Sequence, residues 1–389
     1  MARHRITLSS MCFAVAMGFV SFIAAPWSTA ATTQRLMAPV STGQLWIAID
    51  NGGDHSCGIA KGHTLWCWGQ NSRGELGLGD TSDRLVPTQV GAGTDWQSIS
   101  TGFHHTCGIR TDFSLWCWGW NRYGQLGLAD KTDRLVPTQV GLASWAHVSG
   151  GYGHTCGRNT DNTLWCWGWN RDGQLGLGST TNRRVPTRVG SNVDWAHINT
   201  GAHHSCALRF DDTLWCWGLN DVGQLGLGDT NTHLVPTQVG VDISWAHSSM
   251  GIGHTCATGL DSTLWCWGDN SRGQLGLGDT INRLLPAQVG PDIAWAPISA
   301  GGLHTCGIAT DDTLRCWGRN GSGQLGVGDT LERDLPTQVG TDTNWSELAA
   351  GYLHTCAIRT DHTLWCWGGN NHGQLGLGDT MKRSTPQLV

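Results

Sequence analysis

Hydrophobic and polar positions follow one pattern that repeats along the chain every 49 or 50 residues. The segment Gly-Gln-Leu-Gly begins at 124, 173, 223, 273, 323 and 373, and Gly-Glu-Leu-Gly begins at 74. Each unit opens with Trp, continues with Gly-x-x-His-Thr/Ser-Cys and a later Cys-Trp-Gly, and closes with Pro-x-x-Val. The units begin near residues 46, 96, 145, 195, 245, 295 and 345. Such self-similarity indicates side-by-side copies of one supersecondary unit.

Each unit predicts four short strands. In the seventh unit the second strand covers 354–358 and the third 364–367, joined by a turn-rich loop. The first strand starts at the opening Trp, and the fourth follows the Pro. The third strand carries Leu and Cys on one face and two Trp on the other, so both faces must be buried between neighbours. We therefore expect an all-β, seven-bladed β-propeller with four antiparallel strands per blade over 46–389.

Composition agrees with this architecture. The chain has 56 Gly, which serve tight turns, and 23 Trp against 6 Phe and 3 Tyr. The repeat assigns 20 of these Trp to the scaffold, as unit openers and as neighbours of the second Cys. Arg315 replaces one of them in the sixth unit, which predicts a position near the rim where its charge reaches water.

The first thirty residues differ from the repeat. Arg3 and Arg5 precede an apolar run at 11–25, and small residues follow up to Ala30, which is typical of a signal peptide over residues 1–30. The run is shorter than the roughly 20 apolar residues of a membrane anchor. We expect residues 31–45 to be a short linker, the mature chain to lack a membrane span, and the protein to be secreted or on the extracellular surface.

Charge argues against nucleic acid as a partner. The formal net charge is −6, and loss of the leader's two Arg residues would make it more negative by two. An acidic exported protein has no electrostatic reason to bind nucleic acid.

The cysteines predict one disulfide in each blade. Every unit has two Cys ten positions apart, and a three-residue turn would place them opposite each other on neighbouring strands. Export supplies an oxidising compartment. Zinc is the competing interpretation, but zinc ligands that are close in sequence are usually separated by two to four residues, so we expect no metal. The predicted pairs are Cys57–Cys67, Cys107–Cys117, Cys156–Cys166, Cys206–Cys216, Cys256–Cys266, Cys306–Cys316 and Cys356–Cys366.

The segment 351–379, GYLHTCAIRTDHTLWCWGGNNHGQLGLGD, resembles the repeat of the regulator of chromosome condensation family. The resemblance covers the chain from Trp46 to Val389 and implies a propeller closed into a ring. The family's best-known activity is guanine-nucleotide exchange on a small GTPase. The signal peptide disfavours that activity here.

Positions that vary between units are free to carry specificity. They fall in the loops between the first and second strands and between the third and fourth strands, which emerge at the same end of an up-and-down blade. The predicted partner-binding residues on this face are Phe103, His104, Trp120, Arg122, Tyr123, Tyr152, Trp169 and Tyr352. Trp, Tyr and Arg are favoured in interface hot spots. The alternative is that these side chains only pack on local loops.

No catalytic motif stands out in the sequence. We expect a non-enzymatic, monomeric binding propeller without a cofactor that engages a protein partner. A glycan-binding surface module is the main alternative. An exchange factor for a small GTPase and an enzyme with a weakly marked site in the central channel are the others.

Overall fold

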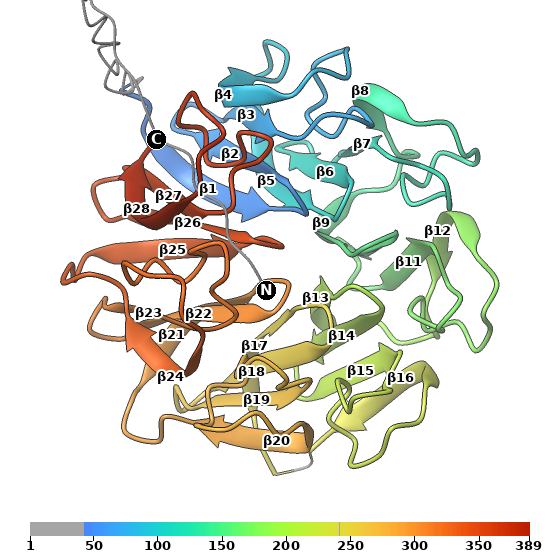
Figure 1. The fold of residues 1–389 in the computed structure, drawn as a ribbon. Helices are drawn as coiled ribbons and strands as arrows, with labels where there is room; N and C mark the ends of the chain where they lie inside the picture. Colours follow the sequence, from blue (N-terminus) through green and yellow to red (C-terminus); the bar gives the residue numbers. More distant parts are fainter. Residues whose placement is uncertain (1–42, 241) are drawn as a thin grey trace, which may run out of the picture. The chain divides into compact units, whose positions relative to one another are not determined.

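The computed structural model describes residues 43–240 and 242–389, so the predicted signal peptide and most of the predicted linker lie outside the described residues. Seven four-stranded antiparallel sheets follow one another along the chain, and within each sheet the strands are hydrogen-bonded in sequence order. The sheets are the blades of a ring, numbered here 1 to 7 (Figure 1). The described residues form strands, turns and bends but no helix, and therefore no helical membrane span. The predicted seven-bladed propeller is confirmed.

The first strand of each blade lines the centre of the ring, and the fourth is outermost. The first strands are β1 (Trp46–Asn51), β5 (Trp96–Thr101), β9 (Trp145–Gly150), β13 (Trp195–Thr200), β17 (Trp245–Met250), β21 (Trp295–Ala300) and β25 (Trp345–Ala350). The second strands are β2 (His55–Ala60), β6 (His105–Arg110), β10 (His154–Asn159), β14 (His204–Arg209), β18 (His254–Gly259), β22 (His304–Ala309) and β26 (His354–Arg359). The third strands are β3 (Thr64–Gly69), β7 (Leu115–Gly119), β11 (Leu164–Gly168), β15 (Leu214–Gly218), β19 (Leu264–Gly268), β23 (Leu314–Gly318) and β27 (Leu364–Gly368). The fourth strands are β4 (Arg84–Gln89), β8 (Arg134–Gln139), β12 (Arg183–Arg188), β16 (His233–Val239), β20 (Arg283–Val289), β24 (Arg333–Gln338) and β28 (Arg383–Leu388).

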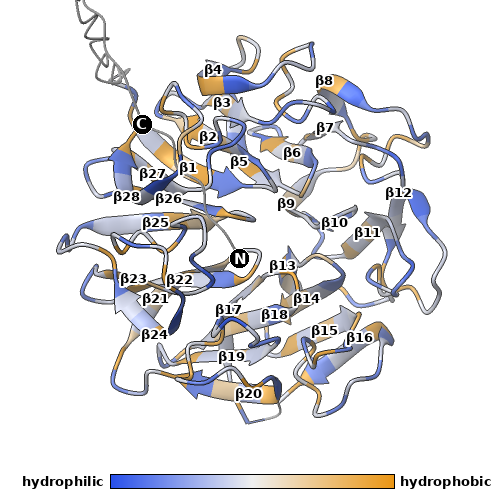
Figure 2. Ribbon diagram, viewed as in Figure 1, coloured by the Kyte–Doolittle hydropathy of each residue, from blue (hydrophilic) through white to orange (hydrophobic). Residues whose placement is uncertain are grey.

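The fourth strand starts earlier than the sequence suggested. In blade 6 it begins at Arg333, three residues before Pro336, rather than after the Pro. Proline is tolerated there because the strand is at the outer edge, where the missing N–H leaves no ladder partner unsatisfied. The register also shifts between Cys316 and Gly318 of the neighbouring strand, which loosens the pairing at this point. Figure 2 shows hydrophilic and hydrophobic residues interspersed along the connections around the ring.

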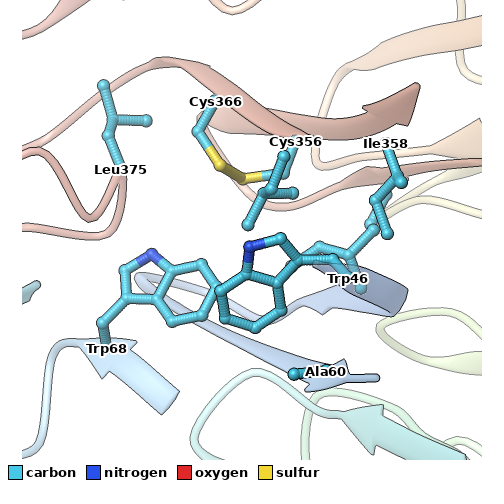
Figure 3. Close-up of a cluster of buried hydrophobic side chains, with 10 residues drawn as sticks. Trp46, Ala60, Trp68, Cys356, Ile358, Cys366 and Leu375 are labelled. Atoms are coloured by element: carbon cyan, nitrogen blue, oxygen red, sulfur yellow. A yellow bond between two sulfur atoms is a disulfide. The ribbon is translucent and has the colours of Figure 1, made fainter. Parts of the chain in front are cut away.

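Each blade contains one disulfide, as predicted. Cys356 and Cys366 are directly opposite each other in the pairing of β26 with β27, with their Cα atoms 4.1 Å apart, and all seven pairs repeat this arrangement. The zinc interpretation of these cysteines is therefore wrong. All fourteen are fully buried. Figure 3 shows that the Cys356–Cys366 disulfide of blade 7 packs toward Trp46 and Trp68 of blade 1, so the sulfurs belong to the core between blades.

The histidine of each Gly-x-x-His motif is buried, but its hydrogen-bond partner lies in the next blade rather than inside its own. Its Nε2 is 2.9–3.0 Å from the hydroxyl of the Thr or Ser that precedes the first Cys there. The pairs are His55–Thr106, His105–Thr155, His154–Ser205, His204–Thr255, His254–Thr305, His304–Thr355 and His354–Ser56.

A main-chain carbonyl completes each of these junctions. The Gln of Gly-Gln-Leu-Gly (Glu75 in blade 1) offers its carbonyl oxygen to the next blade, where the same Thr or Ser hydroxyl donates at 2.8–2.9 Å. The indole Nε1 of the Trp before Gly donates to the same oxygen at 2.8–3.0 Å. Because the hydroxyl donates its only proton to the carbonyl, it must accept from the histidine, which requires that Nε2 of the histidine carries a proton.

The glycine three residues before each histidine is required by this packing. A Cβ on Gly351 would lie 2.4 Å from Cε1 of His354 and 2.8 Å from the carbonyl oxygen of Gly52 in blade 1. Only a residue without a side chain lets the inner strand of one blade and the imidazole come this close.

The ring closes between blades 7 and 1 with the contacts used at the other junctions. His354, the carbonyl of Gln374 and Trp68 form the junction described above. The Asn51 side chain adds a 2.7 Å hydrogen bond to the carbonyl oxygen of Ala349. Every blade is built from consecutive strands, so no strand from one end of the repeat completes the blade at the other end.

We predict that a protein consisting of residues 31–389, denatured without reductant, presents no reactive thiol, and that two thiols per blade appear after reduction. A thiol-reactive dye with mass spectrometry measures this. Reactive thiols before reduction would contradict the pairing. Removing one bridge, with Cys356→Ser and Cys366→Ser together, should lower the free energy of unfolding by about 2–3 kcal/mol because the open hairpin regains conformational freedom.

A second prediction concerns acid. Burial lowers the pKa of six junction histidines, to about 4 for one of them and about 3 for the rest, and lowers that of the seventh, His154, well below its ordinary value. Below roughly pH 6.5 the unfolded chain takes up protons that the folded chain excludes, so stability falls as the pH drops toward 4. Each histidine contributes up to ~1.4 kcal/mol per pH unit in this window and nothing above it. Unfolding by denaturant at pH 7, 6 and 5 checks this; equal stability at the three pH values would contradict the junction.

Candidate binding face

Consecutive antiparallel strands place the loops after the first and third strands of every blade at one end of the ring. We call this end the variable face. It carries all eight predicted binding residues. Phe103, His104, Tyr152 and Tyr352 lie between first and second strands, whereas Trp120, Arg122, Tyr123 and Trp169 lie between third and fourth strands. All are partly exposed except Arg122, which is exposed.

The structure brings the seven ring-bearing members of this set together. Phe103 lies centrally, with ring centroids 4.7 Å from Tyr152 and 5.3 Å from Tyr352. Tyr152 approaches Trp169 at 6.0 Å and Trp120 at 6.5 Å. We call the group formed by Phe103, His104, Trp120, Tyr123, Tyr152, Trp169, His203 and Tyr352 the aromatic cluster. It reaches from blade 7 across blades 2 and 3 to blade 4.

The outer part of the cluster is formed by stacked and edge-on pairs. Tyr123 stacks on Trp169 with centroids 5.1 Å apart and planes inclined by 13°. Arg122 lies beside this pair, with its guanidinium carbon 5.9 Å from the Tyr123 centroid. His203, absent from the sequence prediction, stacks on Tyr152 and meets Trp169 edge-on at 4.8 Å. The rings therefore support one another.

Two glycines leave space for the central rings. A Cβ on Gly53 would lie 3.2 Å from the Phe103 ring, and one on Gly302 would lie 2.6 Å from the Tyr352 ring. Phe103 and Tyr352 thus each lean over the preceding blade, across a position where a larger residue would clash. The lean of Phe103 over blade 1 carries its ring toward blade 7, so rings of blades 7 and 2, which are not neighbours, come into contact.

A carboxylate lies beside each histidine of the cluster. The Nδ1 atom of His104 is 3.4 Å from a carboxylate oxygen of Glu75, which is fully buried, and that of His203 is 3.0 Å from Asp172. Glu75 occupies the position that holds Gln in the other six units. This single departure from Gly-Gln-Leu-Gly is a signal in the sequence that could have located the pair.

A central cavity of about 290 Å³ opens among the inner strands and the first loops. Residues of all seven blades line it: 50–53, 99–103, 147–152, 199–202, 249–252, 299–302 and 350–352. Phe103, Tyr152 and Tyr352 of the aromatic cluster are among them. The lining contains the carboxylate of Asp50 but no Lys or Arg.

Asp50 bridges two blades through the main chain. One carboxylate oxygen accepts the N–H of Thr101 in blade 2 at 2.7 Å, and the other accepts the N–H of Asn51 at 2.9 Å. Burial, which outweighs these hydrogen bonds, raises the pKa of Asp50 to about 6. It takes part in no ion pair among the described residues.

Other blades make the same bridge without a charge. Ser100, Ser149, Ser249 and Ser299 hold the position of Asp50, and each Oγ accepts the corresponding N–H of the next blade at 2.9–3.1 Å. The bridge therefore requires an acceptor, not a carboxylate. Comparing the units at this position would have singled out Asp50, which the sequence prediction missed.

Three histidines form a second feature that the sequence prediction missed. His147, His197 and His247 are the third residues of β9, β13 and β17, with centroids 4.9 Å apart for the first pair and 6.3 Å for the second. Burial lowers the pKa of His147 to about 3 and lowers that of His197. Within residues 43–240 and 242–389 no group of three or more His, Cys, Asp or Glu side chains is arranged to hold a metal ion.

These observations define a disulfide-stapled, seven-bladed propeller with its diversity on one face. Models of the regulator of chromosome condensation (RCC1) repeat match 63–109, 114–157, 161–208, 211–258, 261–308, 311–358 and 361–389. A second model of this repeat matches 46–75, 96–125, 145–174, 195–224 and 345–374. The chain belongs to the regulator of chromosome condensation repeat family.

Solved structures share the fold. Human WBSCR16 is 21% identical, with a TM-score of 0.76 over 84% of this chain and 93% of that chain. Prp20p from Saccharomyces cerevisiae is 20% identical, with a TM-score of 0.75 over 89% and 87%. The ectodomain of the Arabidopsis thaliana receptor kinase ACR4 is 22% identical, with a TM-score of 0.52 over 87% and 98%. Comparison with curated proteins finds no match.

The environment of Asp50 predicts that Asp50→Ser stabilises the protein at neutral and alkaline pH. A raised folded-state pKa means that the charged form is disfavoured above about pH 6, and this penalty disappears once the carboxyl is protonated. We expect a gain of about 1–3 kcal/mol at pH 8 that shrinks between pH 6 and 4. Denaturant unfolding across this range measures it, with exposed Asp221→Asn as the charge-matched control. A loss of stability at pH 8 would contradict the assignment.

Proposed function

We propose that the protein is a secreted, non-enzymatic binding propeller that engages a protein partner through the aromatic cluster of the variable face. The observation that carries the proposal is the continuous contact of the eight aromatic or imidazole rings of the aromatic cluster, which come from loops after the first and third strands of several blades. The scaffold does not need these rings, because other blades have Gly, Ala, Leu or Asp at the equivalent positions.

The residue types of the aromatic cluster and the packing of its rings against one another favour a protein partner. Partly exposed Trp and Tyr residues that are held rigid by neighbours provide contact area with little loss of side-chain entropy. A glycan would need free ring faces, yet Tyr123 and Trp169 turn their faces toward each other. Secretion is supported by the seven disulfides, which are stable in an oxidising compartment.

An exchange factor for a small GTPase is the alternative that the family suggests. Prp20p has been studied for its binding to Gsp1p and histones. At 20% identity it shares the fold with this chain, and the oxidised cysteines argue against a cytosolic partner.

The proposal predicts that immobilised mature protein retains a specific protein from the extracellular fraction of its source, and that Trp120→Ala with Trp169→Ala reduces retention at least tenfold. Loss of anchor residues at the centre of an interface typically costs 2 kcal/mol or more, which corresponds to roughly 30-fold. Quantitative mass spectrometry of the eluate measures it.

The matched control is Phe210→Ala. Phe210 is an aromatic residue, 61% exposed, in the β14–β15 hairpin at the opposite face, and its loss should leave retention unchanged. Equal retention by wild type and the double variant would refute the face assignment. Binding to a glycan array with no retained protein would replace the proposal with the glycan alternative.

A further inference from the structure

The scaffold requires a hydrogen-bond acceptor at the position of Asp50, but it does not require the negative charge of a carboxylate. Four other blades make the same inter-blade hydrogen bond with a neutral Ser Oγ, so the charge of Asp50 contributes nothing to this bridge that a hydroxyl does not. A charge held inside a protein without an ionic partner is unfavourable. Asp50 is the only acidic residue that lines the central cavity, and its charge faces a space that the described chain does not fill with a cation.

The cavity around Asp50 suits a cation. Its lining contains no Lys or Arg that could neutralise the carboxylate. Each carboxylate oxygen accepts one main-chain N–H, and the hydroxyls of Ser100 and Thr101 also act on this carboxyl group, so the Asp50 carboxylate is surrounded by neutral donors only. At the same cavity lie Phe103, Tyr152 and Tyr352, whose ring faces attract positive charge. Aromatic rings and a carboxylate that line the same cavity are the two features that recognise an organic cation.

The size of the cavity limits the occupant. A helix with side chains is about 10–12 Å wide, whereas the cavity of about 290 Å³ is at the lower end of the range for small ligands. A single extended side chain fits this space. A divalent metal ion would need several anionic or oxygen ligands, and no such group is found in the described part of the chain.

We infer that the central cavity receives a Lys or Arg side chain of the protein partner, with its positive charge on the Asp50 carboxylate and its stem alongside the Phe103, Tyr152 and Tyr352 rings that line the cavity. The inference rests on the proposed function, because the same rings belong to the aromatic cluster. It adds the chemistry of the partner: a basic residue that projects from the segment bound at the centre of the variable face.

The test uses the full mature chain and defined probes. Acetyl-Gly-Lys-Gly amide and acetyl-Gly-Arg-Gly amide are titrated against it by saturation-transfer NMR, with the norleucine peptide as the uncharged isostere of Lys. We expect at least one basic peptide to bind ten times more tightly than the norleucine peptide. Equal affinities, or no binding by either basic peptide, would overturn the inference.

The variant series separates charge from architecture. Asp50→Ser retains the acceptor that blades 2, 3, 5 and 6 use and should abolish the preference for the basic peptide. Asp221→Asn removes an exposed charge from the same face and should leave the preference intact. A preference that survives Asp50→Ser would overturn the inference. Tighter binding of free n-butylamine than of the Lys peptide would overturn the assignment to a partner's side chain.

Partner retention distinguishes this inference from the proposed function. If Trp120→Ala with Trp169→Ala abolishes retention but Asp50→Ser does not weaken it, the function stands and the cation inference fails. If Asp50→Ser also weakens retention at least tenfold, both are supported. If the Trp variants retain the partner like the wild type, the proposed function fails whatever the peptides show.

Discussion

The whole ring depends on one acceptor, the main-chain carbonyl of the residue before Leu in each Gly-Gln-Leu-Gly. This carbonyl oxygen accepts hydrogen bonds from the hydroxyl and the indole N–H of the next blade. That hydroxyl in turn accepts a hydrogen bond from the imidazole of the blade that holds the carbonyl. Each bond adds on the order of 1 kcal/mol, but leaving any of these buried groups unpaired costs more. Seven equal junctions therefore hold the blades together, while the disulfides secure only the hairpins within them.

This arrangement leaves the loops of the variable face free to differ in sequence between blades. Because the junction residues satisfy the buried main chain, the loops after the first and third strands can differ between blades without weakening the ring. The aromatic side chains are distributed unevenly over the variable face and lie over blades 7, 2, 3 and 4. The loops of blades 5 and 6 have Ile252, Gly302, Asp269 and Arg319 at the equivalent positions. The face is thus asymmetric although the scaffold beneath it is nearly symmetric.

Sequence periodicity predicted the blades, the strand order and the disulfides because each of these is a local pattern repeated seven times. Arg315 is partly buried, as are the Trp residues at the same position of the other blades, so burial does not set it apart as a rim residue. Pro336 misled the prediction of the fourth strand, since an edge strand tolerates a residue that an inner strand would exclude. The partners of the buried histidines lie about fifty residues away in the next blade, and the contact of Phe103 with Tyr352 joins residues from opposite ends of the repeat. The spacing of residues within one unit gives no information about contacts between different units. Asp50 was missed because strand positions were treated as scaffold.

Ring closure by an ordinary junction has an evolutionary consequence. Since no strand is shared between the first and last blades, the architecture does not require the chain ends to lie at one particular junction. A gene that starts at any other unit would encode the same set of neighbours. Exchange of whole units between related genes would likewise transplant a complete, internally crosslinked module with its own surface loops. New specificities can arise in this way by shuffling blades, without redesign of the interior.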